Sequence, residues 1–193
     1  PEEFAESMAK LVPLGLRICG GCCGTTPEYI EKLCEALKDK KHVENTVRKY
    51  PAVCSATKAV DIEEPRIIGE RINPTGKKLF KQALIDGDMD YILNQAVAQV
   101  KGGADILDVN VGLPEIDEKE MMVRAVKEIQ AVVDVPLQID TTKPDVLEAG
   151  LRFYNGKAIV NSVNGEDERI ATVLPLVKKY GASVVGLTLD KGG

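Results

Sequence analysis

Acidic and amide side chains recur at the ends of four short apolar segments of this sequence. In chain order they are Glu70, Asn73, Asp108, Asn110, Asp140 and Asn161. One ionised carboxylate can accept both the ring N–H and the neighbouring NH2 group of a 2-amino-4-oxopyrimidine, and amides supply complementary donors and acceptors. Polar residues can also cap strands for stability alone, but their recurrence on four segments favours a site that binds a flat heterocycle.

Phosphate binding is disfavoured at these ends, because few basic residues accompany the acids. Arg71 is the nearest, and the more distant ones are Lys77, Lys78 and Lys143.

A second candidate site is the adjacent pair Cys22 and Cys23, which follows two glycines and precedes a helical pattern. Neighbouring cysteines do not easily form an unstrained disulfide, and a helix N-terminus lowers thiol pKa values. Thiolates in this position are good ligands for Zn²⁺. Two ligands do not complete a metal site, so a third would have to come from elsewhere. We expect Cys19 and Cys34 to be core residues instead.

The elements that must position the polar side chains alternate between strand and helix from Arg66 onward. The candidate strands are 66–72, 105–111, 136–141, 158–163 and 184–189. Their spacing leaves room for a crossover helix each time, which predicts an α/β fold with a parallel sheet. No G-x-G-x-x-G follows the first strand, so we favour a TIM-barrel type, (β/α)8, over a doubly wound sheet.

The barrel is expected to be partial, because residues 66–193 hold five of the eight strands. Residues 1–38 read as a helix, a buried strand over 14–19, a glycine-rich turn and a helix capped by Thr25. Residues 39–65 lack a sustained period and are predicted to be an interdomain connector. The chain begins with Pro1 rather than Met, which suggests a piece of a longer protein, and we do not expect it to fold alone.

Composition limits the class of protein. The chain has 193 residues, 44% of them hydrophobic and 28% charged, which is ordinary for a soluble globular protein. A net charge of −5 and 4% aromatic residues argue against nucleic-acid binding. No apolar run reaches the ~20 residues of a membrane helix. An odd count of five cysteines favours a reducing, cytoplasmic location.

Several motifs, in this order, resemble the N-terminal two-barrel region of the cobalamin-dependent methionine synthase family. GGCCGTTPEYI (20–30) is similar to the last strand and helix of its homocysteine-binding barrel. The pterin-binding barrel's first four strand ends are similar to IGERINPTG (68–76), DILDVNVG (105–112), PLQIDTT (136–142) and AIVNSVNGE (158–166).

The resemblance implies a role for each candidate residue. Cys22 and Cys23 match two thiolate ligands of a catalytic zinc, whose third ligand lies outside this chain. Asp140 and Asn161 match the carboxylate and amide that grip the pterin ring. The polar rim around that ring is matched by Glu70, Asn73, Asp108 and Asn110.

The implied activity is a methyl transfer from 5-methyltetrahydrofolate, through cob(I)alamin held by another module, to zinc-activated homocysteine. Its products are methionine and tetrahydrofolate. Two alternatives stay open: a stand-alone pterin methyltransferase that serves a corrinoid protein, and a folate-binding module without catalysis. A dihydropteroate synthase-like enzyme is disfavoured, because we find no paired basic residues for a pyrophosphate substrate.

Overall fold

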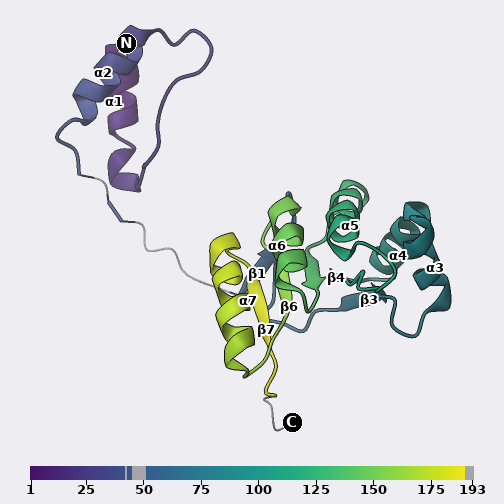
Figure 1. Ribbon diagram of the computed structural model, residues 1–193. Coiled ribbons are helices and arrows are strands. Elements are labelled where there is room, and N and C mark those ends of the chain that lie inside the picture. The colour runs from purple at the N-terminus through teal and green to yellow at the C-terminus, as the bar shows by residue number, and fades with distance from the viewer. Residues whose placement is uncertain (42, 45–50, 190–193) are drawn as a thin grey trace. The chain divides into compact units, whose positions relative to one another are not determined.

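The computed structural model divides the chain into two units, residues 1–49 and 50–193, and describes residues 1–41, 43–44 and 51–189. The second unit contains a sheet of five strands, β3 to β7 (Figure 1). Their bounds are β3 (Ile68–Ile72), β4 (Ile106–Val109), β5 (Leu137–Asp140), β6 (Ile159–Val163) and β7 (Ser183–Gly186). Each of the five expected strands is therefore present, in a shortened form.

Every neighbouring pair in this sheet is parallel, and the spatial order follows the chain order β3-β4-β5-β6-β7. A doubly wound sheet would reverse its direction of winding at one strand, whereas a barrel adds each new strand on the same side. The observed order is therefore that of a partial (β/α)8 barrel, as the sequence predicted.

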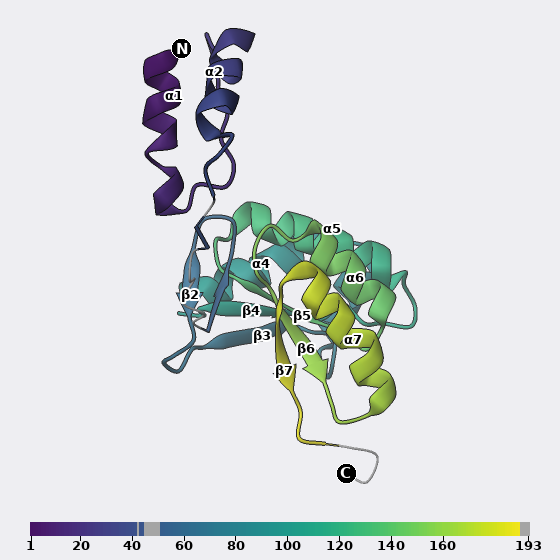
Figure 2. The same cartoon turned by 90° about the vertical axis from the view of Figure 1, so that its left-hand side faces the viewer.

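Crossover helices pack on one face of the sheet (Figure 2). They are α3 (Lys78–Asp86), α4 (Met89–Lys101), α5 (Glu118–Val132), α6 (Pro144–Phe153) and α7 (Asp167–Tyr180). Outward-facing residues such as Leu107, Val109 and Ile139 form the main core with them. Successive strand residues point to opposite faces. The residues between these, including Asp108 and Asp140, therefore face the other side, which is the inside of a barrel.

Local signals explain where these helices begin and end. The side chain of Asp117 accepts a hydrogen bond from the backbone N–H of Glu120 at 2.9 Å and so caps the start of α5. Gly181 ends α7 in the left-handed region with φ 65°. At the end of α4, Gly102 is the C-cap with φ −79°, and the positive φ of 96° falls on Gly103.

The predicted connector over 39–65 differs from the structure at its second half. β1 (Ala52–Cys54) and β2 (Ala59–Asp61) form an antiparallel hairpin in the second unit. Its Val53 and Val60 pack against Ile106 and Ile159, on the face of the sheet opposite the helices. Strands of three residues are too short to give a periodic pattern, which is why the sequence did not indicate them.

The first unit is a pair of helices, α1 (Glu2–Ala9) and α2 (Pro27–Leu37), with a short 3₁₀ helix, η1 (Val12–Leu14). The rings of Phe4 and Tyr29 meet edge to face, with centroids 5.6 Å apart. Thr26 is the N-cap of α2, one residue after the predicted Thr25.

The predicted strand over 14–19 is wrong, as is the core position expected for Cys19 and Cys34. Ile18 is 90% exposed, Cys19 is half-buried and Cys34 is exposed. An extended segment needs a neighbouring strand for its backbone hydrogen bonds, and the described part of the first unit contains none. Across both units, no helix among the described residues is long and apolar enough to cross a membrane.

Candidate functional site

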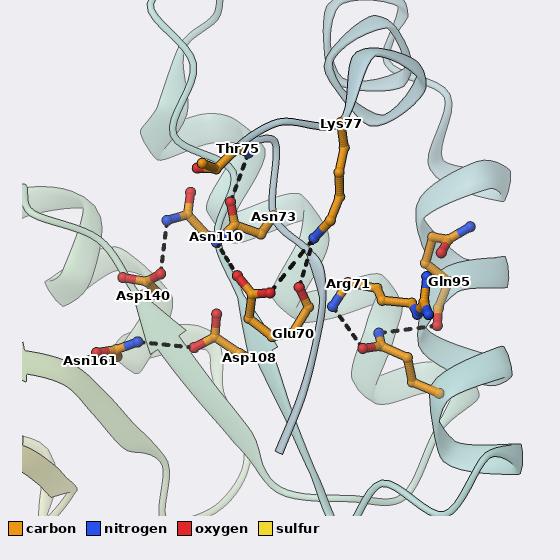
Figure 3. Close-up of polar contacts among 11 residues, drawn as sticks. Glu70, Arg71, Asn73, Thr75, Lys77, Gln95, Asp108, Asn110, Asp140 and Asn161 are labelled. Carbon is orange, nitrogen blue, oxygen red and sulfur yellow. Dashed lines mark hydrogen bonds and ion pairs between the residues drawn. The ribbon is translucent and has the colours of Figure 1, made fainter. Parts of the chain in front are cut away.

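The six polar residues predicted for the rim all lie in the second unit, at or just beyond the carboxyl ends of β3 to β6 (Figure 3). Asp140 on β5 and Asn161 on β6 are direct partners in the parallel register. Asp108 on β4 is paired in the same way with Gln138 on β5. Alternation along each strand places these four side chains on one face of the sheet, so the structure brings together the groups that the sequence singled out.

Asp108 is the most deeply buried acid of this group, with 1% of its surface exposed. Its Oδ1 accepts hydrogen bonds from the amide of Gln138 and, at 3.3 Å, from Nδ2 of Asn161. Its Oδ2 is buried and has no hydrogen-bond partner. Burial raises the pKa of Asp108 to about 6, and repulsion from Asp140 and Glu70 adds to the effect, while the two amide hydrogen bonds oppose it.

Asp140 is held in place by an amide from the neighbouring strand. Nδ2 of Asn110 donates to Oδ2 of Asp140 at 2.9 Å, and Oδ1 of Asn110 accepts from the backbone N–H of Gly112 at 2.8 Å. No hydrogen bond of the described residues uses Oδ1 of Asp140, which is therefore free for a ligand. Burial raises the pKa of Asp140, as does repulsion from Glu70 and Glu118.

Asn73 orders the segment that follows β3. It is 7% exposed, its Nδ2 donates to Oε1 of Glu70 at 2.9 Å, and its Oδ1 accepts from the backbone N–H of Thr75 at 2.9 Å. The ammonium of Lys77 donates to the backbone carbonyl of Glu70 at 2.9 Å and lies 3.8 Å from its Oε2. Glu70 itself stays largely exposed, so its carboxylate can meet a ligand at the edge of the rim.

Sequence reasoning missed two buried residues that support this rim. Gln138 interrupts the apolar strand β5 two positions before Asp140, and this spacing was a usable signal because residues i and i+2 share a face. Glu118, at the start of α5, is 7% exposed. Its carboxylate accepts a hydrogen bond from the hydroxyl of Thr141 at 2.7 Å and forms an ion pair with Lys143 at 2.9 Å. Nothing in the sequence indicated this pairing, since Glu118 begins α5 whereas both partners lie in the segment that follows β5.

Cys22 and Cys23 belong to the first unit, where both are exposed and their sulfur atoms lie 3.7 Å apart. Hydrogen bonding from the backbone of Cys23, and then from its thiol, lowers the pKa of Cys22. Two thiolates about 2.3 Å from one tetrahedral zinc would be about 3.8 Å apart, so the pair fits two ligand positions of that ion. Residues 1–41, 43–44 and 51–189 contain no group of three potential ligands.

A barrel-type sheet whose strand ends carry carboxylates and amides offers the acceptors and donors that a flat, hydrogen-bonding ring requires. The chain belongs to the family described as pterin binding enzyme, whose model matches residues 69–192. A second model, described as homocysteine S-methyltransferase, matches residues 1–37.

Two curated relatives match the chain over its whole length, and both are methionine synthases. The identity is 36% to that of Mycobacterium tuberculosis and 35% to that of Mycobacterium leprae. The chain spans 17% of the length of each relative. The resemblance stated from the sequence motifs is therefore confirmed.

Among solved structures, a dihydropteroate synthase from Xanthomonas albilineans with 4-aminobenzoic acid has a TM-score of 0.53 and 21% identity to this chain. The match covers 73% of this chain and 51% of the synthase. At that identity the likeness concerns the fold alone, and it agrees with a partial barrel.

Proposed function

We propose that this chain is a segment of a folate-dependent methyltransferase of the methionine synthase type. The second unit, from residue 66 onward, would form the first half of a barrel that binds 5-methyltetrahydrofolate. The observation that carries this proposal is the pairing of Asp140 with Asn161 at adjacent strand ends, with Asn110 and Asp108 hydrogen-bonded to them.

The side chains of Asp140 and Asn161 each keep an oxygen atom that can accept a hydrogen bond from a pterin. Asp140 keeps Oδ1 free while Asn110 holds Oδ2. A carboxylate anchored through one oxygen can still accept from the ring N–H and the NH2 group of a pterin. Asn161 donates its Nδ2 to Asp108, which leaves its Oδ1 to accept from a further N–H of the ligand. The remaining rim residues, Glu70 and Asn73, would close the site on the β3 side.

The negative charge of the rim also suits methyl transfer from N5, the ring nitrogen of 5-methyltetrahydrofolate that carries the methyl group. A methyl group on that nitrogen leaves poorly unless a proton or hydrogen bond offsets the charge that builds there. The acidic groups Glu70, Asp108 and Asp140 favour a positively charged ligand over a neutral one, because opposite charge nearby stabilises the protonated form. The rim would therefore both hold the ring and assist its protonation.

We assign the first unit, over residues 1–38, to the end of a homocysteine-binding barrel. Cys22 and Cys23 would hold two positions of a zinc ion, with a third ligand from outside this chain. Zinc bound there would stabilise the thiolate of homocysteine, and cobalamin on another module would supply the methyl carrier. The family model at residues 1–37 and the 3.7 Å separation of the two sulfur atoms support this assignment. A cytoplasmic location belongs to the same proposal.

The test is a titration of the longer protein that contains this chain with 5-methyltetrahydrofolate. Asp140→Asn removes the charge but keeps the shape, and should weaken binding by about 1–3 kcal/mol, or roughly 5- to 150-fold. Asp86→Asn, at an exposed position of α3, is the matched control and should bind as wild type does. Unaltered affinity of the Asp140 variant would contradict the proposed site.

A further inference from the structure

The sheet itself gives little support to the two strand ends that carry Asp140 and Asn161. The ladder between β5 and β6 ends where the backbone N–H of Thr141 donates to the carbonyl of Asn161 at 3.3 Å, which is long for such a bond. On its other side, β6 changes its register against β7 over Asn161 and Ser162. An irregularity of this kind redirects a side chain, but it also leaves part of the strand unpaired.

Arg169, in the first turn of α7, bridges these two strand ends. Its guanidinium donates to the backbone carbonyl of Thr142 at 2.7 Å and to that of Ser162 at 3.1 Å. Thr142 lies two residues after Asp140, and Ser162 follows Asn161 directly. Among the hydrogen bonds of the described residues, these two alone connect the segments beyond the end of the ladder.

The guanidinium of Arg169 is not engaged by a carboxylate. No ion pair formed within residues 1–41, 43–44 and 51–189 includes it. The side chain is half-buried and lines a cavity of about 520 Å³, together with Thr142 and Ser162. Because both segments border this open space, the planar fork of donors spans the distance between them by reaching two carbonyls at once.

The β5 side of this bridge is fixed independently by Glu118. Buried at the start of α5, its carboxylate accepts from the hydroxyl of Thr141 at 2.7 Å and pairs with Lys143 at 2.9 Å. These two partners flank Thr142, whose carbonyl is therefore held in place. Arg169 ties the end of β6 to that fixed point, and hydrogen bonds from a charged donor are stronger than neutral ones.

We propose that Arg169 is a positioning residue for folate binding, which holds the carboxylate of Asp140 and the amide of Asn161 at the separation that one pterin ring requires. The inference rests on the proposed pterin site. A rigid ring cannot follow two strand ends that move apart, so fixing their separation beforehand lowers the cost of binding. Arg169 acts through the backbone, because both of its hydrogen bonds go to main-chain carbonyls.

The experiment compares wild type with Arg169→Lys in the longer protein that contains this chain. Lysine keeps the charge, but its single ammonium cannot reproduce the fork that reaches both carbonyls. The affinity for 5-methyltetrahydrofolate should fall roughly tenfold. Hydrogen exchange of the Thr141 amide, measured without ligand by mass spectrometry, should become faster because the last bond between β5 and β6 loosens.

Arg124→Lys is the matched control. Arg124 of α5 also donates to a backbone carbonyl, that of Gly87 at 3.3 Å, but this contact lies outside the rim. The control variant should keep both the folate affinity and the exchange rate of wild type.

Combination with Asp140→Asn separates positioning from a general loss of structure. If Arg169 acts by placing the groups that bind the ring, Arg169→Lys should cost no more than about threefold in the D140N background, against roughly tenfold in wild type. Urea unfolding checks that the lysine variant folds. If it does not, Arg169→Gln takes its place and should show a loss at least as large.

The inference is overturned if the Arg169 variant binds folate as tightly as wild type does. It is also overturned if the variant loses the same factor in both backgrounds, which would indicate an effect unrelated to Asp140. Wild type that does not bind folate, or D140N with unaltered affinity, would overturn the pterin site and with it this role of Arg169. Folate binding that depends on Asp140 but not on Arg169 would overturn the positioning role alone.

Discussion

Asn110 donates its side-chain N–H to Oδ2 of Asp140 at 2.9 Å, and this bond ties the end of β4 to the end of β5. Asn110 is fixed in turn by the backbone N–H of Gly112. The carboxylate that we assign to the pterin is therefore oriented by a neighbour with a fixed geometry. Orientation of this kind lowers the cost of ordering the carboxylate when a ligand binds.

The first prediction concerns this hydrogen bond. Asn110→Asp replaces a donor with a second carboxylate in contact with Asp140, so repulsion should raise the pKa of Asp140 further and weaken folate binding at pH 7 by roughly tenfold or more. Asn110→Ala should have a smaller effect of a few-fold, because it removes the bond without adding charge. Both affinities can be measured by the same folate titration. As a control, Asn155→Asp adds the same charge in an exposed loop and should leave the affinity for folate unchanged. Equal losses of affinity in both Asp variants would contradict a specific repulsion between residue 110 and Asp140.

The second prediction concerns the pH dependence of stability. The pKa of Asp108 is about 6 in the folded protein, against about 3.9 in an unfolded chain. Because the folded state binds this proton more tightly, the contribution to stability is full below about pH 4 and is lost as the pH rises through 6. Asp108→Asn removes this dependence. Wild type should therefore lose about 1 kcal/mol of stability between pH 5 and pH 7 that the variant keeps. The free energy of unfolding of the variant minus that of wild type should be larger by this amount at pH 7 than at pH 5.

Urea unfolding of both proteins at the two pH values, followed by circular dichroism, measures this difference. Carboxylates elsewhere, such as Asp134 and Glu148, have lowered pKa values and act in the opposite direction, but they are the same in both proteins and cancel. A variant that tracks wild type across this pH range would show that Asp108 titrates normally.

The sequence was informative wherever a signal was local. Each of the five strands is an apolar run flanked by turn residues, and parallel strands put their polar ends at one edge. The grouping of Asp108, Asn110 and Asp140 could therefore be predicted without coordinates. The cap at Asp117 is local in the same sense, because donor and acceptor lie three residues apart.

The errors concern features that depend on partners distant in the chain. The segment 14–19 has a strand-like composition but no strand beside it, and the hairpin at 52–61 is ordered by contacts with Ile106 and Ile159. In the sequence, the basic residues Arg71, Lys77 and Lys78 are too few to indicate phosphate binding. Only the packing of α4 against β3 reveals that they share one cavity.

The third prediction concerns the attachment of that hairpin. Tyr154 is buried, with 8% of its surface exposed. Its hydroxyl accepts a hydrogen bond from the backbone N–H of Leu137 at 3.2 Å and donates one to the backbone carbonyl of Cys54 at 2.9 Å. Tyr154→Phe leaves both backbone groups without this partner and should cost about 1–3 kcal/mol of unfolding free energy. Urea unfolding measures the cost, and hydrogen exchange at the Leu137 amide should quicken. Tyr180→Phe loses only a bond to the surface residue Glu148, and a loss as large there would argue against a specific role for Tyr154.

The fourth prediction is that zinc content depends on the adjacent cysteines. In the longer protein, Cys22→Ser and Cys23→Ser should each reduce bound zinc to well below one equivalent, because a neutral hydroxyl is a poor replacement for a thiolate. Elemental analysis after dialysis provides the measurement. Cys34→Ser, which alters another exposed cysteine of the same unit, should keep the wild-type content. Full zinc in the Cys22 variant would remove this residue from the ligand set. A wild-type protein without zinc would instead favour a pterin methyltransferase that acts on a separate corrinoid protein, since the second unit could bind folate without any contribution from Cys22 and Cys23.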